Sequence, residues 1–412
     1  MPRAEQSTGG TSLHPAEDGV WQDSPMIDDP EEEKVIFNAL DSFSQYGKVA
    51  HFNVTHLRRQ SFYALPQSQW QMLAAPPFNF LDTLSRVDDA IDTNAELSAA
   101  IVRSGLASFG MSEMPRLWKG ASKHGDIDKA RGTIRQFYRD WTADGAKERE
   151  ASYGPIIRAL ESERTRQDRR QLKVLVPGAG LGRLVFDLCV GGYEVEGNEI
   201  SYHQLLASSY ILNECASADQ HTIYPWVHTF SNHRSRENHL RSYTIPDIHP
   251  AATLKAAGEG AGSMCMCAAD FLCLYGDDEH KDEYDAVACV FFLDTAPNLV
   301  RYLEVIWRCL RPGGVLVNTG PLLWHFENNA PGNHGKDDDG DGEHDASNSS
   351  GIADPGSFEL SEDEVMTLLD KVGFVVEWKE HGIETPYIQD RDSMLLTTYR
   401  SSAWVARKPN RG

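Results

Sequence analysis

A glycine-rich turn after a short apolar run constrains the fold of this chain more than any other feature. Residues 172–177 (LKVLVP) have the pattern of a buried strand, and Gly178, Gly180 and Gly182 follow at alternate positions before a helix-like segment from Arg183. Glycines let a backbone turn tightly and approach a ligand without an intervening side chain. The amides at the following helix start favour an anionic group. The turn therefore predicts a site for a nucleotide-like cofactor.

The spacing of these glycines distinguishes two cofactor classes. A dinucleotide fingerprint requires its third glycine at position 183, which is Arg183 here. The G-x-G-x-G spacing suits the methionine part of S-adenosylmethionine better than a pyrophosphate. The RPGG turn at 311–314, just before a strand candidate, is typical of class I methyltransferases. We therefore predict S-adenosylmethionine as the cofactor and disfavour a dehydrogenase.

Two acidic residues follow later strand candidates. Glu199 lies 21 residues beyond Gly178, where a carboxylate can accept hydrogen bonds from both ribose hydroxyls. Asp270 and Phe271 close a further strand candidate, where the acid is placed to bind the adenine amino group and the ring to cover the adenine. Both acids also have a plainer interpretation, as a helix N-terminal acid and a helix cap respectively.

Strand and helix patterns alternate through the second half of the chain. Strands are predicted at 172–177, 193–196, 264–268, 284–293 and 315–319, a helix at 300–310, and a final antiparallel pair at 374–379 and 402–406. Strands that alternate with helices form a parallel sheet covered on both faces. The predicted fold is therefore α/β, a class I Rossmann-like methyltransferase domain with a mostly parallel sheet over 166–412.

Three other segments differ from this domain in composition. Residues 1–30 are rich in polar residues and are predicted to be a disordered tail. Residues 31–165 show helical periodicity and are predicted to form a helical N-terminal extension, which passes into a charged connector at 161–170. Residues 331–356 are acidic and low in complexity, which predicts a solvated surface insertion within the methyltransferase domain.

Charge and cysteine content limit the partners. The net charge is −22, so we expect no nucleic-acid or membrane-surface partner. The seven cysteines are scattered through apolar segments, which predicts reduced thiols in a cytoplasmic protein, with a nuclear location also open. No paired C-x-x-C accompanies Cys265, Cys267 and Cys273, so we predict no metal site. The sequence leaves a homodimer open.

Six stretches together resemble one family, the carnosine N-methyltransferases. They are RQFYRDW (135–141), LVPGAGLGRL (175–184), GNEISY (197–202), YPWVHTFSNHR (224–234), FFLDTAPN (291–298) and GPLLWHFEN (320–328). The resemblance spans roughly 31–330 and 357–409. It implies methyl transfer from S-adenosylmethionine to the histidine imidazole of carnosine (β-alanyl-histidine), which gives anserine, and of related small His-containing dipeptides.

The resemblance also assigns cofactor contacts. Carried over position by position, they fall on Gln136, Arg139, Gly178, Gly180, Glu199, Asp270, Phe271 and Val290. Gln136 and Arg139 lie in the helical extension, where a residue-based analysis alone finds no sign of them. The resemblance implies that this helix closes over the cofactor, with Arg139 placed to pair with the methionyl carboxylate.

The implied substrate contacts are Asp294, His325 and two aromatic positions near the carboxyl end. Here the chain reads Thr397-Thr398-Tyr399 where animal members carry three tyrosines, so Thr397 replaces a contacting tyrosine. We predict Asp294, His325 and Tyr399 as catalytic residues and all four positions as substrate contacts. Two alternatives remain, a methyltransferase that acts on histidine in proteins or longer peptides and a cofactor-binding scaffold without catalysis.

Overall fold

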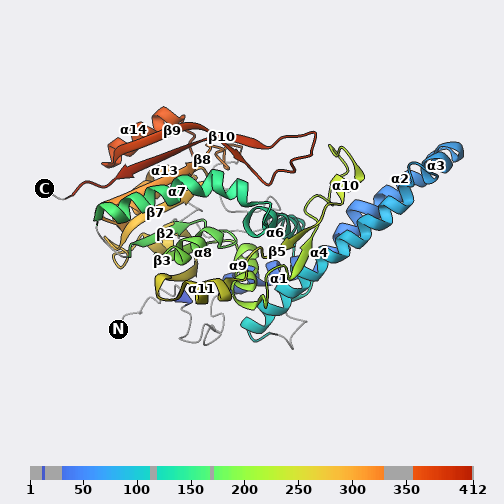
Figure 1. Ribbon diagram of the computed structural model, residues 1–412, viewed down its shortest axis with the longest axis horizontal. Coiled ribbons are helices and arrows are strands. Elements are labelled where there is room, and N and C mark those ends of the chain that lie inside the picture. The colour runs from blue at the N-terminus through green and yellow to red at the C-terminus, as the bar shows by residue number, and fades with distance from the viewer. Residues whose placement is uncertain (1–11, 14–29, 112–117, 168–170, 329–355, 411–412) are drawn as a thin grey trace, which may run out of the picture.

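A computed structural model describes residues 12–13, 30–111, 118–167, 171–328 and 356–410. Its centre is a twisted sheet with helices on both faces, and a helical arm projects far from one side of it (Figure 1). Apart from Ser12–Leu13, the tail predicted to be disordered lies outside the described residues, and so does the acidic insertion up to residue 355.

The main sheet has the strand order β1-β6-β3-β2-β7-β8-β10-β9. Its parallel strands are β2 (Lys173–Pro177), β3 (Glu194–Glu199), β6 (Ser263–Ala268), β7 (Tyr284–Val290) and β8 (Leu310–Gly320). Strands β9 (Val375–Pro386) and β10 (Thr398–Arg407) pair antiparallel at one edge, and the two-residue strand β1 (Ser12–Leu13) pairs antiparallel with β6 at the other. The predicted class I sheet is confirmed, and the pairing of Ser12–Leu13 corrects the disorder predicted for those two residues.

Helices precede, connect and cover these strands. In the first half lie α1 (Pro30–Ala50), α2 (Leu57–Tyr63), α3 (Gln67–Ala74), α4 (Phe80–Ser108), α6 (His124–Trp141) and α7 (Ala146–Gln167), with a π-helical segment His51–His56 between α1 and α2. The second half contains α8 (Arg183–Val190), α9 (Tyr202–Ser209), α10 (Arg236–His239), α11 (Pro250–Ala257), α12 (Phe271–Tyr275), α13 (Leu299–Cys309) and α14 (Glu362–Val372). A small hairpin of β4 (His221–Ile223) and β5 (Tyr243–Ile245) lies between α9 and α11 in sequence. No helix in the described ranges is both long and apolar enough to cross a membrane.

Strand β7 is shorter than the sequence suggests. All its residues up to Cys289 are buried, as expected for a parallel strand covered on both faces. The predicted strand ran to Leu293, but the chain turns at Phe291, whose φ is +52°, and Leu293–Thr295 form a single 3-10 turn. An apolar run does not reveal where a left-handed residue ends a strand.

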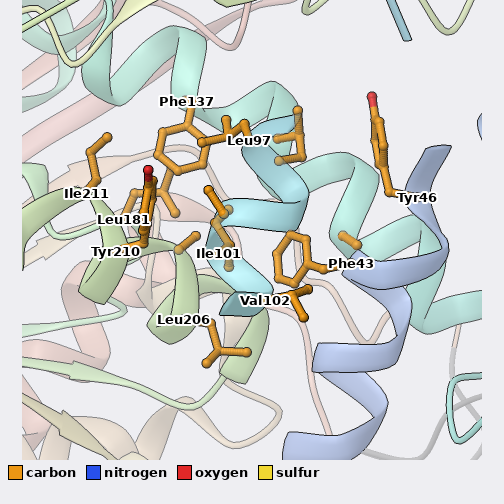
Figure 2. Packing of buried hydrophobic residues seen from close by; sticks show 14 of the residues in the cluster. Phe43, Tyr46, Leu97, Ile101, Val102, Phe137, Leu181, Leu206, Tyr210 and Ile211 are labelled. Carbon is orange, nitrogen blue, oxygen red and sulfur yellow. The ribbon is translucent and has the colours of Figure 1, made fainter. Parts of the chain in front are cut away.

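The helical extension and the methyltransferase domain share one hydrophobic core. Side chains of α1, α4 and α6 pack against residues from the glycine turn and from the segment that includes α9 (Figure 2). Phe43, Ile101 and Phe137 come from the extension, and Leu181 and Ile211 come from the domain; all are 1% exposed or less. The extension is therefore packed as part of one core and holds α6 rigidly beside the glycine turn.

Helix α7 corrects the predicted charged connector, because it continues through 161–167 and packs on β7, β8 and β9. Its Glu163 is buried, and both of its carboxylate oxygens accept hydrogen bonds from Arg407 of β10, one of them at 3.0 Å. The Arg407 guanidinium also donates to Glu377 of β9 at 2.7 Å. In the sequence Glu163 looks like a solvated charge, but its partner Arg407, 244 residues away, makes it a buried structural contact.

Replacing Glu163 by alanine should lower the free energy of unfolding by about 2 kcal/mol. Removal of one partner of a buried ion pair costs roughly 3–5 kcal/mol, and the effect is smaller here because Glu377 still binds Arg407. Urea unfolding measures the change, with Glu161→Ala on the exposed face of the same helix as the control. Equal midpoints for the two variants would show that the buried pair adds nothing.

Candidate active site

The glycine turn lies at the carboxyl end of β2, where its backbone has little room for side chains. Gly178, Gly180 and Gly182 have φ of +66°, +58° and +73°. A Cβ on Gly178 would lie 2.9 Å from the ring of Phe292, and one on Gly180 would lie 3.1 Å from the Gln136 amide nitrogen. Both the dihedral angles and the close approach therefore require glycine at these two positions.

Arg183 has a structural role in the place where a dinucleotide fold has its third glycine. It is 7% exposed, and its guanidinium donates to Asp247 at 2.6 Å and to the backbone oxygen of Asp140 at 3.0 Å. The same group lies over the ring of Trp141, 5.0 Å from the centroid. Arg183 thereby connects the start of α8 to the end of α6. The residue that departs from the dinucleotide pattern is therefore needed for the packing of these two helices.

Glu199 lies beside the glycine turn, as predicted. It is 6% exposed, and its carboxylate accepts hydrogen bonds from the backbone N–H groups of Gly180, Ile200 and Ser201, each at 2.9 Å. Burial raises the pKa of this carboxyl, and the three amides oppose that rise. The structure thus shows one function of Glu199, which is to hold the turn in shape.

Asp270, Phe271 and Val290 lie at the ends of β6 and β7. Asp270 caps α12, because one of its oxygens accepts from the N–H groups of Leu272 and Cys273 at 2.8 and 3.1 Å, which is the plainer interpretation given above. Phe271 is 4% exposed and packs edge-on against Phe292 at 5.4 Å between centroids. Val290 ends β7 and is half-buried. All three lie on the same edge of the sheet as the glycine turn.

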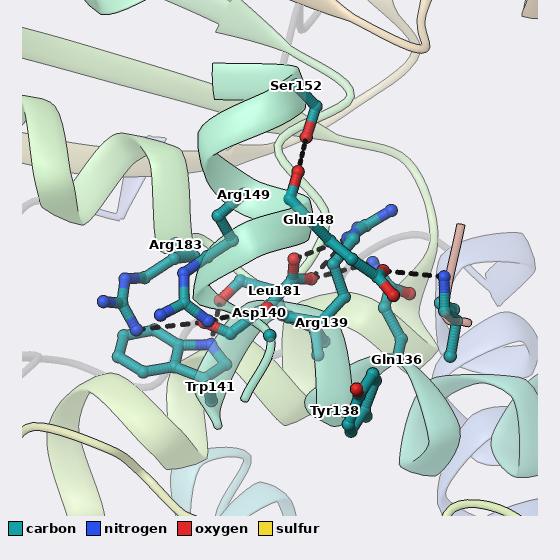
Figure 3. A network of polar contacts seen from close by, with 12 residues as sticks. Gln136, Tyr138, Arg139, Asp140, Trp141, Glu148, Arg149, Ser152, Leu181 and Arg183 are labelled. Atoms are coloured by element: carbon teal, nitrogen blue, oxygen red, sulfur yellow. Dashed lines mark hydrogen bonds and ion pairs between the residues drawn. The ribbon is translucent and has the colours of Figure 1, made fainter. Parts of the chain in front are cut away.

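Helix α6 lies beside the turn through Gln136, whose amide nitrogen is the near neighbour of Gly180, and Arg139 follows on the same helix (Figure 3). Their contacts with a cofactor stay a prediction. The Gln136 side-chain oxygen accepts from Gln204 at 3.1 Å. Arg139 donates twice to Asp140, at 2.7 and 3.1 Å, and lies over the ring of Tyr387 at 5.4 Å. Burial would lower the pKa of Arg139, but the adjacent Asp140 carboxylate reverses this and raises it overall.

Asp140 is a site residue that the sequence did not reveal. It is 1% exposed and accepts a hydrogen bond from Gln136 at 3.2 Å, in addition to those from Arg139 (Figure 3). The Tyr153 hydroxyl donates to the same carboxylate at 3.0 Å. Its carboxylate therefore orients both residues that were assigned to the cofactor on α6. The adjacent Arg-Asp pair in the RQFYRDW stretch was the only available signal, and it resembles an ordinary exposed pair.

Asp294 and His325 come from distant segments that the structure joins. Asp294 is 2% exposed and accepts from the Leu323 N–H at 2.9 Å, and its backbone oxygen accepts from the His325 N–H at 3.1 Å. Burial raises the pKa of the Asp294 carboxyl, and the nearby His325 imidazole opposes the rise. The backbones of Asp294 and His325 are therefore joined at one junction after β7 and β8, where Asp294 is buried and His325 is exposed.

Three rings form a cluster beside this junction, which we call the aromatic cluster: Phe291, Tyr387 and Tyr399. Tyr399 contacts both other rings at 5.9 Å, and Phe291 and Tyr387 lie 5.4 Å apart. Burial, Tyr387 and the charge of Asp294 together raise the pKa of Tyr399. The cluster reaches α6 through the ring of Tyr387, which lies under the Arg139 guanidinium.

Tyr387 changes the interpretation of Thr397. The sequence comparison left Tyr399 as the one remaining phenol, whereas the structure supplies a second from Tyr387 at the far end of β9. Thr397 lies next to this pair, and its backbone oxygen accepts from the Tyr387 N–H at 3.0 Å. A role for the Thr397 side chain in substrate binding stays a prediction.

The described residues contain no group of three or more metal-ligating side chains placed to hold an ion. All seven cysteines are free thiols. The site just described therefore consists of the glycine turn, the carboxylates of Glu199 and Asp270, the polar face of α6, the Asp294–His325 junction and the aromatic cluster.

Comparison with known proteins settles the family. A family model described as "Carnosine N-methyltransferase" matches residues 117–410. This chain belongs to the carnosine N-methyltransferase family. A family member from Schizosaccharomyces pombe is 36% identical over 389 residues, which cover 92% of this chain and 97% of that protein. Another from Rattus norvegicus is 32% identical over 92% of this chain and 87% of its own length.

A further relative, named "Carnosine N-methyltransferase unmet", comes from Drosophila melanogaster. It is 33% identical over 97% of this chain and 85% of its own length. Among solved structures, a SAM-dependent methyltransferase from Methanosarcina mazei is 15% identical, with a TM-score of 0.34 over 59% of this chain and 95% of that one. The family assignment rests on the family model and the sequence relatives alone.

Proposed function

We propose that this chain transfers a methyl group from S-adenosylmethionine to the imidazole of carnosine, which gives anserine, and that it acts on related small His-containing dipeptides. The observation that carries this proposal is the junction of Asp294 and His325, with the aromatic cluster whose Tyr387 ring lies under the Arg139 guanidinium of α6. The names of the relatives support carnosine as the acceptor.

The residues around the turn fit S-adenosylmethionine. Gly178 and Gly180 leave a backbone cradle that a Cβ would fill. Glu199 keeps acceptor capacity for a ribose hydroxyl, since a carboxylate offers about four lone-pair sites and three backbone amides donate to it. We assign the adenine edge to Asp270, Phe271 and Val290. We assign the amino-acid end to Gln136 and Arg139, with the Arg139 guanidinium pairing with the carboxylate.

When bound, the cofactor supplies a methyl group on a sulfonium, which is already an excellent electrophile. The protein therefore has to orient the acceptor. A neutral imidazole, with a pKa of about 6.5, has a lone pair on one nitrogen only. We propose that Asp294 accepts the ring N–H, which directs the other nitrogen toward the methyl group and stabilises the positive charge that develops. His325 would bind the dipeptide together with Thr397, and Tyr399 would position the ring.

A product assay tests this function. The purified chain is incubated with S-adenosylmethionine and a panel of carnosine, glycyl-histidine, N-acetylhistidine and a ten-residue peptide with one central histidine. Mass spectrometry should show one added methyl on the imidazole of carnosine, with the other dipeptides modified more slowly. Methylation of the longer peptide alone would favour the protein-histidine alternative, and no product with any acceptor would favour the cofactor-binding scaffold.

We also propose that the acceptor is the main partner, with no nucleic-acid or membrane partner, in a cytoplasmic protein that can also enter the nucleus. The net charge of −22 supports the absence of a nucleic-acid partner, because it repels phosphates.

We further propose a homodimer. Exposed large apolar side chains gather on the projecting arm, among them Phe52, Tyr63, Met72 and Phe78, and they support a protein contact there. Sedimentation velocity tests the dimer, and imaging of a tagged chain tests the location.

A further inference from the structure

A strained turn carries Tyr387 between the last two strands. Ile388, the residue after Tyr387, has a φ of +47°, and β-branched residues rarely adopt this left-handed conformation. A conformation of this kind persists only where the surrounding structure holds it in place. The turn connects the end of β9 to a loop that closes on the start of β10, so it also lies beside Tyr399.

One buried carboxylate holds this turn. Glu148 of α7 is 4% exposed, and its two oxygens accept from the N–H groups of Ile388 at 2.8 Å and Gln389 at 2.7 Å. Arg135 of α6 donates to the backbone oxygen of Ile388 at 3.0 Å. Three consecutive backbone groups of the turn are thus bonded to side chains of two helices (the Glu148 side chain is drawn in Figure 3).

The held turn fixes the ring that precedes it. The Tyr387 ring lies under the Arg139 guanidinium at 5.4 Å and against Phe291 and Tyr399 at 5.4 and 5.9 Å. The Arg139 side chain is itself held by Asp140. A shift of the turn would therefore move the wall of the aromatic cluster while the α6 side of the site stays in place.

We infer that Glu148 is a positioning residue for the acceptor: by bonding to the strained Tyr387–Gln389 turn as a clamp, it sets the place of the Tyr387 ring in the aromatic cluster. This inference rests on the proposed function, because it takes the aromatic cluster as the acceptor site. Glu148 itself does not touch the reacting atoms, and its effect is transmitted through the backbone of the turn.

The chemistry of the clamp requires a carboxylate. Each of its oxygens faces one backbone N–H. Glutamine has the same shape but only one acceptor oxygen, and its NH2 group would face the second N–H, donor against donor. Glu148→Gln therefore removes one hydrogen bond and loosens the turn without opening a cavity.

The first test is amide hydrogen exchange on the whole chain without acceptor. The amides of Ile388 and Gln389 should exchange at least about tenfold faster in Glu148→Gln than in the wild type, since tenfold corresponds to about 1.4 kcal/mol of opening free energy. The amides in the middle of α7 should remain protected. Unchanged exchange at the turn would overturn the clamp, and because no acceptor is present this result does not depend on the proposed function.

The second test is steady-state kinetics with carnosine. Glu148→Gln should raise KM for carnosine about tenfold (~1.4 kcal/mol) and leave the S-adenosylmethionine Kd within about twofold. Glu150→Gln is the matched control, because it makes the same change on the exposed face of α7 and affects only a pair with Arg158. Faster exchange with an unchanged KM would overturn the positioning role, and so would a parallel rise in KM and cofactor Kd. Absence of carnosine turnover in the wild type would instead count against the proposed function.

Discussion

Replacing Asp294 by asparagine should lower kcat/KM for carnosine by about a thousandfold and leave the S-adenosylmethionine Kd within about twofold. Asparagine keeps the shape of the side chain, and its oxygen can still accept from the Leu323 N–H. The variant loses the negative charge of Asp294, which is 2% exposed. In the wild type this charge stabilises the positive charge that the acceptor imidazole gains on methylation. Removal of one preorganised electrostatic group typically costs 10²–10³ in rate. In this variant the carboxylate that selects the tautomer of the acceptor imidazole is lost as well.

The comparison needs a control from the same junction. Glu327→Gln makes the same chemical change two residues beyond His325, at an exposed position. Initial rates with carnosine and calorimetric titration with S-adenosylmethionine should separate the two variants, while their melting temperatures should agree with the wild type. If Asp294→Asn kept turnover within threefold of the wild type, Asp294 would have no part in orienting or stabilising the imidazole.

The cofactor half of the site was predictable because it is local in sequence. The carboxyl ends of parallel strands meet at one edge of a sheet, so a turn after one strand and an acid after the next must lie close together. Gly180 and Glu199 illustrate this, since the amide of the first donates to the carboxylate of the second at 2.9 Å. The mostly parallel sheet was predicted from the same alternation of patterns, whereas the order of its strands is seen only in the structure.

The acceptor half depends on contacts that no local pattern records. Tyr387 faces Tyr399 only because β9 and β10 pair in one register, in which Tyr399 lies opposite Thr385. Glu148 resembles any acid on an amphipathic helix, and its partners are the backbone amides of residues 240 and 241 positions away. Backbone amides carry no sequence signature, so such a contact becomes visible only in the folded chain.

The resemblance to the family predicted the place of Gln136 and Arg139 but not what fixes them there. Both side chains bond to Asp140, and the extension that carries them shares its core with the glycine turn. The helical region and the methyltransferase domain, which the sequence analysis treats as two segments, therefore stabilise each other through one hydrophobic core. Packing across that boundary is what brings α6, which lies outside the Rossmann-like sheet, beside the glycine turn.

Replacing Glu199 by alanine should raise the S-adenosylmethionine Kd at least a hundredfold, about 2.7 kcal/mol, because one carboxylate has two tasks. It holds the Gly180 amide at 2.9 Å, which keeps the glycine turn in its left-handed shape, and we assign it the ribose hydroxyls. Loss of the side chain frees the turn and removes the ribose acceptor together. Glu194→Ala at the exposed start of the same strand should leave the Kd unchanged.

The pH dependence of binding separates these two tasks. Burial raises the pKa of Glu199 above its ordinary 4.5, so as the pH falls the carboxylate takes up a proton earlier than an exposed glutamate would. Cofactor affinity should therefore weaken on the acid side at a pH above 4.5, and this limb should be absent in Glu199→Gln, which cannot titrate. Glutamine keeps one acceptor oxygen, but its NH2 group faces either the Gly180 N–H or the Ile200 and Ser201 N–H groups, donor against donor. A Glu199→Gln Kd close to that of the wild type would therefore show that neither the turn nor the ribose needs the ionised carboxylate. If the Kd rises, faster exchange of the Gly180 amide in the cofactor-free variant would assign the rise to the turn, and unchanged exchange would assign it to the ribose.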